Sequence, residues 1–382
     1  METKIIKRLL FNALIEHSSK GKALIVLGPR QSGKTTLLRE VAKASDRPYI
    51  FLNCDEPDIR NLLSGATSDK LKSIIGNNKL VIIDEAQRVK DIGITVKLIV
   101  DNIKNVQVIA SGSSAFELSN AINEPLTGRK YEFNLLPFSV RELVEEYGLI
   151  KEKRLLEQRL VFGMYPDIVN NPGMERDNLK NLSGSYLYKD IFNFQEVRRP
   201  EIISKLLESL SLQVCSEVSY NELSRQVDAD KLTVSRYIDL LEKTFVVFRL
   251  RSFSRNLRNE LRKSVKLYFW DNGIRNAVIN NFSGLSLRGD AGALWKNFLV
   301  SEKIKSNLYA NKWVKSYFWR TTQQQEVDYI EEEEGRIYAY EFKWNPGAKK
   351  SSIPLTFKRA YNADISVISP DNYLEFLNSK IK

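Results

Sequence analysis

The chain has 382 residues and a net charge of +11, with 43% hydrophobic and 27% charged residues. This balance is typical of a globular protein of two or three domains. No apolar run approaches the roughly 18–20 residues of a membrane helix, and the first 21 residues lack the apolar core and cleavage site of a secretory signal. Two cysteines and one histidine argue against a disulfide framework and His-based catalytic or metal sites, so we expect a cytoplasmic protein that does not enter a membrane.

The first predicted elements are a strand, a glycine loop and a helix. The apolar run "KALIVLG" predicts a buried strand, "GPRQSGKT" follows at Gly28–Thr35, and "TLLREVAKA" predicts a helix. This is the full G-x-x-x-x-G-K-[ST] pattern in its expected context, in which loop N–H groups and the helix dipole converge on phosphate oxygens. We therefore predict that these residues bind nucleotide phosphates: Gly28, Pro29, Arg30, Gln31, Ser32, Gly33, Lys34, Thr35 and Thr36.

Three side chains are predicted to carry the chemistry of this site. Lys34 can reach the β and γ phosphates, and Thr35 offers a hydroxyl to Mg²⁺. The run "KLVIIDEAQRV" predicts a second buried strand that ends at Asp84 and Glu85, where open α/β sheets place ligand chemistry. Asp84 would hold the Mg²⁺ shell, and Glu85 would orient and deprotonate the attacking water.

A third apolar strand, "VQVIASGSS", ends in serines. The Ser113 hydroxyl could sense the γ-phosphate, although a plain turn fits the same letters. The chain has no N-K-x-D guanine signature, which favours ATP over GTP.

At these residues the stretch resembles the AAA+ ATPases, most closely the prokaryotic branch with "GPRQxGKT", "DEAQ" and "GSS" after successive strands. The similarity continues into "LTGRKYEFNLLPFSVREL" at Leu126–Leu143. The resemblance implies an arginine just before the last strand of the sheet, which is Arg129 here. Such an arginine can act as a finger in trans on a neighbouring subunit, which would require a homo-oligomer; a surface turn residue is the alternative.

The middle of the chain predicts helices and then a winged helix–turn–helix. Residues 141–200 read as polar helices interrupted at "VFGMYPDIV". In "SYNELSRQVDADKLTVSRYIDLLEKTFVVFRLRSF", Ser219 and Glu222 fit a capping box, and an apolar stripe from Val234 to Leu241 precedes a strand. The mixed charge of the second helix fits a packing unit at least as well as a DNA-reading helix.

The strongest basic bias is "RLRSFSRNLRNELRKSVK" at Arg249–Lys266. Arg251, Arg255, Arg258 and Arg262 could bind DNA phosphates, while a solvated face explains the composition equally well.

The C-terminal order "K-x-Y-F-x-D-x-G", helix, D…E-x-K resembles the same ATPase branch and is similar to restriction-endonuclease-like folds. If Glu334 and Gly335 form a two-residue turn, Asp328 faces Glu341, and Lys343 lies on the same face. Asp328 and Glu341 are then candidate metal ligands. Lys296 stands where an acid is expected and would repel a cation, which predicts weak or absent nuclease activity.

We therefore expect an α/β protein with a P-loop NTPase parallel-sheet core at 1–140, a helical lid plus winged helix at 141–255, and a nuclease-like α/β domain at 256–382. The predicted function is Mg²⁺-dependent ATP hydrolysis coupled to DNA binding by the C-terminal half. The alternative is a nucleotide-dependent switch whose C-terminal half binds proteins. A small-molecule kinase is disfavoured because nothing indicates a second substrate pocket.

Overall fold

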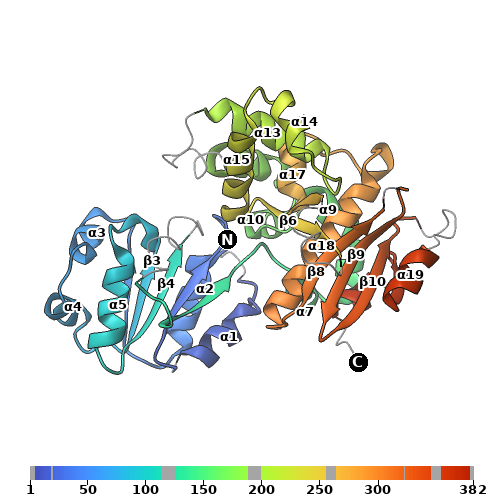
Figure 1. The fold of residues 1–382 in the computed structure, drawn as a ribbon. Coiled ribbons are helices and arrows are strands. Elements are labelled where there is room, and N and C mark those ends of the chain that lie inside the picture. Colours follow the sequence, from blue (N-terminus) through green and yellow to red (C-terminus); the bar gives the residue numbers. More distant parts are fainter. Residues whose placement is uncertain are drawn as a thin grey trace. The chain divides into compact units, whose positions relative to one another are not determined.

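The computed structural model describes residues 5–18, 20–112, 125–187, 199–254, 264–321, 323–345 and 354–378. Two compact units make up the chain (Figure 1). The first contains residues 1–138, 165–170 and 243–245, and the second contains the remainder. Among the described residues, no helix is both long and apolar enough to cross a membrane.

The N-terminal unit is built on a parallel sheet with the order β2-β3-β4-β1-β5. Its strands are β1 (Ala23–Leu27), β2 (Tyr49–Asn53), β3 (Leu80–Asp84), β4 (Gln107–Gly112) and β5 (Lys130–Asn134). Three of them, β1, β3 and β4, are buried at every position, which explains their continuous apolar sequences. The predicted parallel-sheet core is thereby confirmed.

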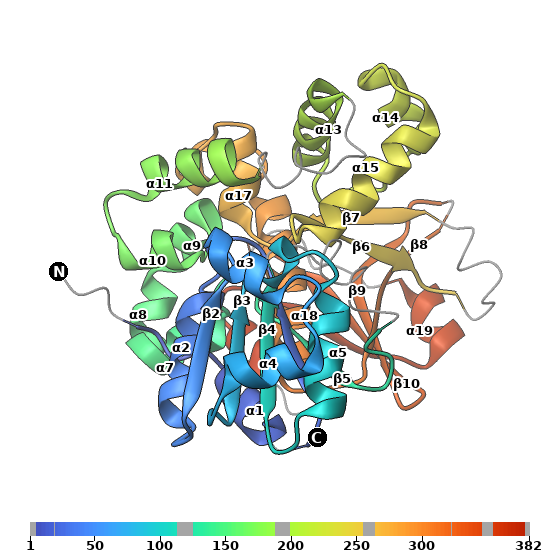
Figure 2. The same cartoon turned by 90° about the vertical axis from the view of Figure 1, so that its left-hand side faces the viewer.

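The N-terminal unit also contains helices, several of which cover the sheet (Figures 1 and 2). They are α1 (Leu10–His17), α2 (Lys34–Ala44), α3 (Pro57–Leu63), α4 (Ser68–Ile75) and α5 (Ile92–Asn102), with short helices η1 (Ala86–Arg88) and α10 (Pro166–Asn170). The apolar stripes of α1 and α2 share a core cluster with alternate residues of the central strands, among them Val26, Ile82 and Ile109. In turn, α4 packs on α5, which contacts β4.

The second unit begins with a helical region. Its helices are α7 (Val140–Tyr147), α8 (Leu149–Arg154), α9 (Leu156–Phe162), α11 (Glu175–Asn181), the π-helix η2 (Leu182–Leu187), α13 (Pro200–Leu212), α14 (Tyr220–Gln226) and α15 (Lys231–Lys243). The Ser219 hydroxyl accepts a hydrogen bond from the N–H of Glu222 at the start of α14. Helix, turn, helix and strand therefore occur where the sequence predicts them; the assignment of a winged helix stays a prediction.

A mixed sheet with the order β11-β10-β9-β8-β6-β7 completes this unit. Its strands are β6 (Val247–Ser252), β7 (Val265–Phe269), β8 (Lys315–Arg320), β9 (Glu326–Glu333), β10 (Arg336–Phe342) and β11 (Asp364–Ile368). The associated helices are α17 (Asn272–Val278), η3 (Leu285–Leu287), α18 (Ala291–Tyr309), α19 (Leu355–Tyr361) and α20 (Tyr373–Asn378). Since β6 pairs with both β7 and β8, the boundary predicted after residue 255 falls between two strands of one sheet.

The hairpin of β9 and β10 has the predicted register. Arg336 pairs with Glu333 and Tyr340 with Tyr329, so the same alignment brings Glu341 opposite Asp328. The turn residues Glu334 and Gly335 have φ angles of 49° and 80°, as a two-residue type I′ turn requires.

Candidate nucleotide-binding site

The predicted phosphate-binding loop, Gly28–Thr35, joins β1 to α2, and two of its residues have left-handed backbone conformations. Gln31 and Gly33 have φ angles of 58° and 91°, a conformation that turns successive N–H groups toward one concave side. Lys34 is buried, and its Nζ donates to the carbonyl oxygens of Gly28 and Pro29 at 2.9 and 2.8 Å. The ammonium group thus lies over the loop. Ser32 is also buried, and its Oγ has no hydrogen-bond partner among the described residues.

Gly28 must be a glycine because the backbone of Leu135 lies against it. A Cβ atom there would lie 2.1 Å from the carbonyl oxygen of Leu135, the residue after β5. The N–H of Leu135 in turn donates to the carbonyl oxygen of Leu27 at 2.7 Å. Since a real Cβ does not approach an oxygen so closely, Gly28 allows the chain that leaves β5 to lie against the loop.

The carboxyl end of β3 brings Asp84 to this loop, beside Ser111 of β4. Asp84 is buried; its Oδ2 accepts from the Thr35 hydroxyl at 2.7 Å, and its Oδ1 accepts from the Ser111 hydroxyl. Thr35 and Asp84 are therefore adjacent, as predicted. The hydroxyl that contacts the acid is that of Ser111, on β4, whereas Ser113 lies outside the described residues.

Glu85 follows Asp84 in a left-handed conformation with φ 51°. A non-glycine residue held in this region is strained, and such strain often marks a functional site. The carboxylate of Glu85 accepts from the Gln87 amide at 2.7 Å, and its N–H donates to Ser111 Oγ at 3.4 Å. The "DEAQ" sequence thus supplies an acid and the amide that orients it.

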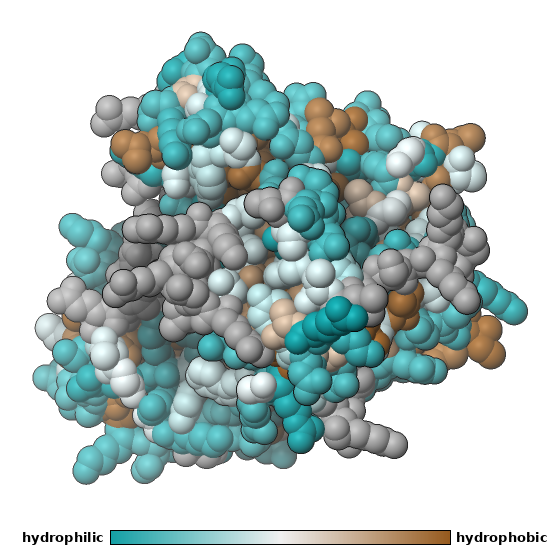
Figure 3. All heavy atoms as spheres, turned by 45° about the vertical axis from the view of Figure 1, so that its right-hand side comes forward, coloured by the Kyte–Doolittle hydropathy of each residue, from teal (hydrophilic) through white to brown (hydrophobic). Residues whose placement is uncertain are grey.

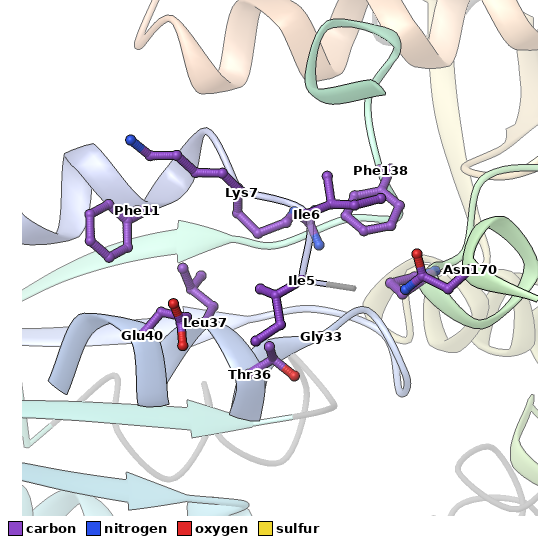
Figure 4. Close-up of a pocket in the computed structure, with 12 residues that line it drawn as sticks. Ile5, Ile6, Lys7, Phe11, Gly33, Thr36, Leu37, Glu40, Phe138 and Asn170 are labelled. Atoms are coloured by element: carbon purple, nitrogen blue, oxygen red, sulfur yellow. The ribbon is translucent and has the colours of Figure 1, made fainter. Parts of the chain in front are cut away.

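A cavity of about 400 Å³ lies beside the loop (Figure 4). Its lining is mainly apolar and combines the N-terminal segment, the first turns of α2, Phe138 and α10: Ile5, Ile6, Lys7, Arg8, Phe11, Gly33, Thr36, Leu37, Glu40, Phe138, Pro166 and Asn170. Figure 4 shows Ile5 close to Thr36 and Gly33, with Ile6 beside Phe138. The amide oxygen of Asn170 is buried and accepts no hydrogen bond from a described residue. A flat ring with amino groups matches such a cavity in size and polarity.

Arg8 joins the wall of this cavity to the loop. The side chain is 6% exposed, and it donates to the carbonyl oxygens of Ser32 at 2.6 Å and Leu136 at 2.5 Å. Its guanidinium lies 4.7 Å from the ring centre of Phe138. The loop motif predicts Gly33 and Thr36, but it does not predict Arg8 or the other lining residues, because they come from segments far apart in the chain and share no local pattern.

Arg129 lies away from the loop of its own chain. It directly precedes β5, and its carbonyl oxygen accepts from the N–H of Ala23, the first residue of β1. The loop follows the other end of β1, about 17 Å away at 3.3 Å per strand residue. The guanidinium forms an ion pair with Asp101 at 2.7 Å. Arg129 thus does not contribute to the site of its own chain.

In the second unit, the two predicted metal ligands form ion pairs with lysines. Asp328 pairs with Lys296 and accepts from the N–H of Phe342 at 3.0 Å, and Lys343 pairs with Glu341 at 2.8 Å. Burial disfavours the charged form of Lys296, but the neighbouring Asp328 outweighs it and raises the Lys296 pKa. The Lys296 ammonium group therefore occupies the place where the predicted metal cation would bind.

A buried acid on the same helix as Lys296 does not join this cluster. Glu302 is buried, and it accepts from Lys305 Nζ at 2.7 Å and from the N–H of Val140 at 2.6 Å. Within the described ranges, no group of three or more His, Cys, Asp or Glu side chains is arranged to hold a metal ion.

Part of the basic segment is engaged within the protein. Arg249 pairs with Asp239 and Glu242, and the buried Lys266 pairs with Glu326. Arg251 is exposed on β6. Arg255, Arg258 and Arg262 lie outside the described residues.

Residues 20–144 match the model of an AAA domain. Most of this match lies in the N-terminal unit. Its parallel sheet and its loop after the first strand agree with the P-loop fold of AAA+ NTPases. Residues 153–285 and 291–372 match two domains of unknown function.

Similar proteins include one described as uncharacterized from Mycobacterium tuberculosis, 27% identical over 329 residues, which covers 85% of this chain and 70% of that protein. Another, from Haemophilus influenzae, is 22% identical over 70% of this chain and 71% of its own length. Among solved structures, the RuvB Holliday junction branch migration motor of Thermotoga maritima is 14% identical, with a TM-score of 0.34, over 67% of this chain and 95% of that chain. The ORC2 protein of Aeropyrum pernix is 13% identical, with a TM-score of 0.35, over 73% and 94%.

Proposed function

We propose that the protein binds ATP with Mg²⁺ at the phosphate loop and hydrolyses the γ-phosphate. The observation that carries this proposal is the 2.7 Å hydrogen bond between the Thr35 hydroxyl and Asp84. It joins two motifs that are separated by 49 positions in the chain, and it gathers the hydroxyl and carboxylate oxygens that Mg²⁺ prefers.

The chain's own residues have distinct roles in this proposal. The loop N–H groups and Lys34 bind the phosphates, while Thr35 and Asp84 would hold Mg²⁺. When bound, Mg²⁺ neutralises charge on the phosphate oxygens. Glu85, held by Gln87, accepts a proton from water and orients it toward the phosphate. These roles rest on placement at one edge of the sheet and on the donor chemistry.

The cavity beside the loop supports an adenosine nucleotide as the ligand. It begins at Gly33 and Thr36, so a base in the cavity and phosphates on the loop form one continuous site. The apolar side chains would cover the faces of the base, and the Asn170 oxygen would accept from an amino group.

Steady-state ATP hydrolysis with Mg²⁺ tests the proposal. Lys34→Ala should lower turnover by at least about 100-fold, since a lost transition-state donor commonly costs that much. Lys70→Ala is the matched control, because Lys70 is exposed on α4 and lines neither the loop nor the cavity. Turnover that is unchanged in Lys34→Ala would refute the site.

The proposal extends to DNA as the partner of the C-terminal half in a cytoplasmic protein. Its support is the net charge of +11 and the basic segment at 249–266, in which Arg251 is exposed. The face in Figure 3 is mainly hydrophilic, with apolar side chains in small separate groups, which agrees with a polar partner.

The alternative is a nucleotide-dependent switch that binds proteins. Phosphate contacts make DNA affinity fall steeply with salt, so DNA binding that is absent at low salt would favour the switch.

A further inference from the structure

We propose a second anion site in the N-terminal unit, at the sheet edge opposite the phosphate loop, that binds a compact polyphosphate. A cavity of about 490 Å³ opens there. It lies among the segments that lead into β1, β2, β3 and β4, and its described lining contains four cationic side chains and no carboxylate: Lys22, Arg47, Lys79 and Lys104 with Ser18, Gly21, Val100, Ile103, Asn105, Val106, Gln107 and Val108. This site does not depend on ATP hydrolysis.

The backbone around these cations is fixed by hydrogen bonds. The buried Gln107 side chain donates to the carbonyl oxygen of Lys22 at 2.7 Å, and the Gln107 N–H donates to that of Lys79 at 2.9 Å. The N–H of Lys79 donates to Pro48 at 2.8 Å, and Arg47 donates to Ser18 at 3.0 Å. The cationic side chains therefore start from a preorganised floor, which lowers the entropic cost of binding.

The lysines at this edge keep their charge available. Lys22 lies 4.9 Å from the ring centre of Tyr131. None of Lys22, Lys79 and Lys104 forms an ion pair with an acidic side chain that the structure describes. The neighbouring acids Asp101 and Glu132 pair instead with Arg129 and Lys130. Positive charge gathered in a concave site without a counter-charge attracts anions.

The shape of the site favours a compact ligand. A nucleic-acid backbone is usually bound by a basic stripe that follows its phosphates. Here the four cations come from four segments around one cavity of a size that suits a small ligand. The ligand chemistry is two or more phosphate groups close together, from inorganic polyphosphate or from the phosphate chain of a nucleotide.

Isothermal titration of the full chain carrying Lys34→Ala tests this site without the contribution of the phosphate loop. Inorganic tripolyphosphate should bind with one-to-one stoichiometry, and ATP is titrated in parallel. Equal affinities would indicate inorganic polyphosphate as the ligand. Tighter ATP binding that weakens when Lys79 and Lys104 are replaced would indicate a nucleotide at this site.

Adding Lys79→Ala and Lys104→Ala should weaken tripolyphosphate binding by at least about tenfold, because hydrogen bonds to charged groups carry this share of affinity. Both lysines are exposed, so the fold should persist. Lys70→Ala with Lys90→Ala removes the same charge from exposed positions outside the cavity and should change affinity little. The proposal fails if Lys34→Ala alone abolishes binding, if both pairs weaken it equally, or if these lysines bind a single-stranded oligonucleotide but not tripolyphosphate.

Discussion

At the scale of single residues, the two glycines of the phosphate loop are required for different physical reasons. Gly33 adopts φ 91°, which favours glycine over any side chain. Gly28 has no positive φ but faces the carbonyl oxygen of Leu135, 2.1 Å from where a Cβ would lie. One glycine serves loop curvature, and the other serves close packing.

Gly28→Ala should therefore separate the loop from the segment after β5. Overpacking of this kind typically costs about 1–3 kcal/mol of unfolding free energy, and ATP affinity should fall together with stability. Gly65→Ala provides a comparison, since that glycine has φ 60° but no atom within 4 Å of where a Cβ would lie. Chemical denaturation with and without ATP measures both effects; wild-type stability and ATP affinity in Gly28→Ala would show that the contact is unimportant.

The free energy of unfolding should depend on the ionisation of Asp290. Hydrogen bonds from Arg288, opposed by partial burial and helped by Arg275, lower its pKa from 3.8 to about 2. Because the folded-state pKa is depressed, the stabilisation is fully present above the unfolded pKa and is lost as pH falls through the folded value.

The difference in unfolding free energy between wild type and Asp290→Asn should thus be constant above about pH 5 and shrink by about 1 kcal/mol between about pH 4 and pH 2, after allowance for solvent screening. Urea denaturation across that range measures the difference. A gap that stays constant down to about pH 2 would argue that Asp290 is not held ionised by its arginines.

At the scale of elements, the β9–β10 hairpin and α18 decide the chemistry of the second unit. The hairpin places Asp328 opposite Glu341, as metal-dependent nucleases require, but α18 supplies Lys296 to Asp328. A unit charge about 4 Å from a cation costs about 4 kcal/mol even at a moderate dielectric. The cluster should therefore bind divalent cations poorly.

Titration with Mn²⁺ checks this expectation. Lys296→Glu should bind Mn²⁺ at least about tenfold more tightly than wild type, since it removes a repulsive charge and adds a ligand. Lys296→Gln removes only the charge and should fall between the two. Wild-type protein should not cleave DNA with Mg²⁺. Robust cleavage that disappears in Glu341→Ala would instead establish Asp328, Glu341 and Lys343 as a working nuclease site.

The same elements show what the sequence could predict. The strand–loop–helix, the acids after β3 and the hairpin register follow from local patterns: a glycine loop, an apolar run and a two-residue turn at Glu334 and Gly335. The nucleotide-sized cavity does not, because Ile5, Phe138 and Asn170 meet only in the folded chain. Nor does periodicity reveal that Lys296 contacts Asp328, since the two are 32 positions apart.

At the scale of the whole molecule, Arg129 raises the question of assembly. It lies at the sheet edge opposite the phosphate loop and pairs with Asp101, so any role in hydrolysis must be exerted on another copy of the chain. We propose a homo-oligomer in which Arg129 of one subunit neutralises charge at the nucleotide of its neighbour.

Mixing two inactive variants tests this arrangement. Arg129→Ala should bind ATP normally and hydrolyse it about 10³-fold more slowly or worse, and Lys34→Ala should not hydrolyse it. A mixture should regain activity, because subunits with Lys34→Ala supply Arg129 to intact loops. A mixture as inactive as its components, under conditions in which both variants assemble, would exclude a role in trans.

Lys34 and Glu85 are proposed to act on one ATP in successive roles: Lys34 binds it, and Glu85 accepts a proton from the attacking water. A single-turnover experiment with radiolabelled ATP and Mg²⁺ measures retained nucleotide and released phosphate together. Glu85→Gln should retain intact ATP and release no phosphate, because a neutral amide cannot accept a proton from water, whereas Lys34→Ala should retain less nucleotide than Glu85→Gln. Phosphate release by Glu85→Gln at the wild-type rate would contradict the role of Glu85 as proton acceptor.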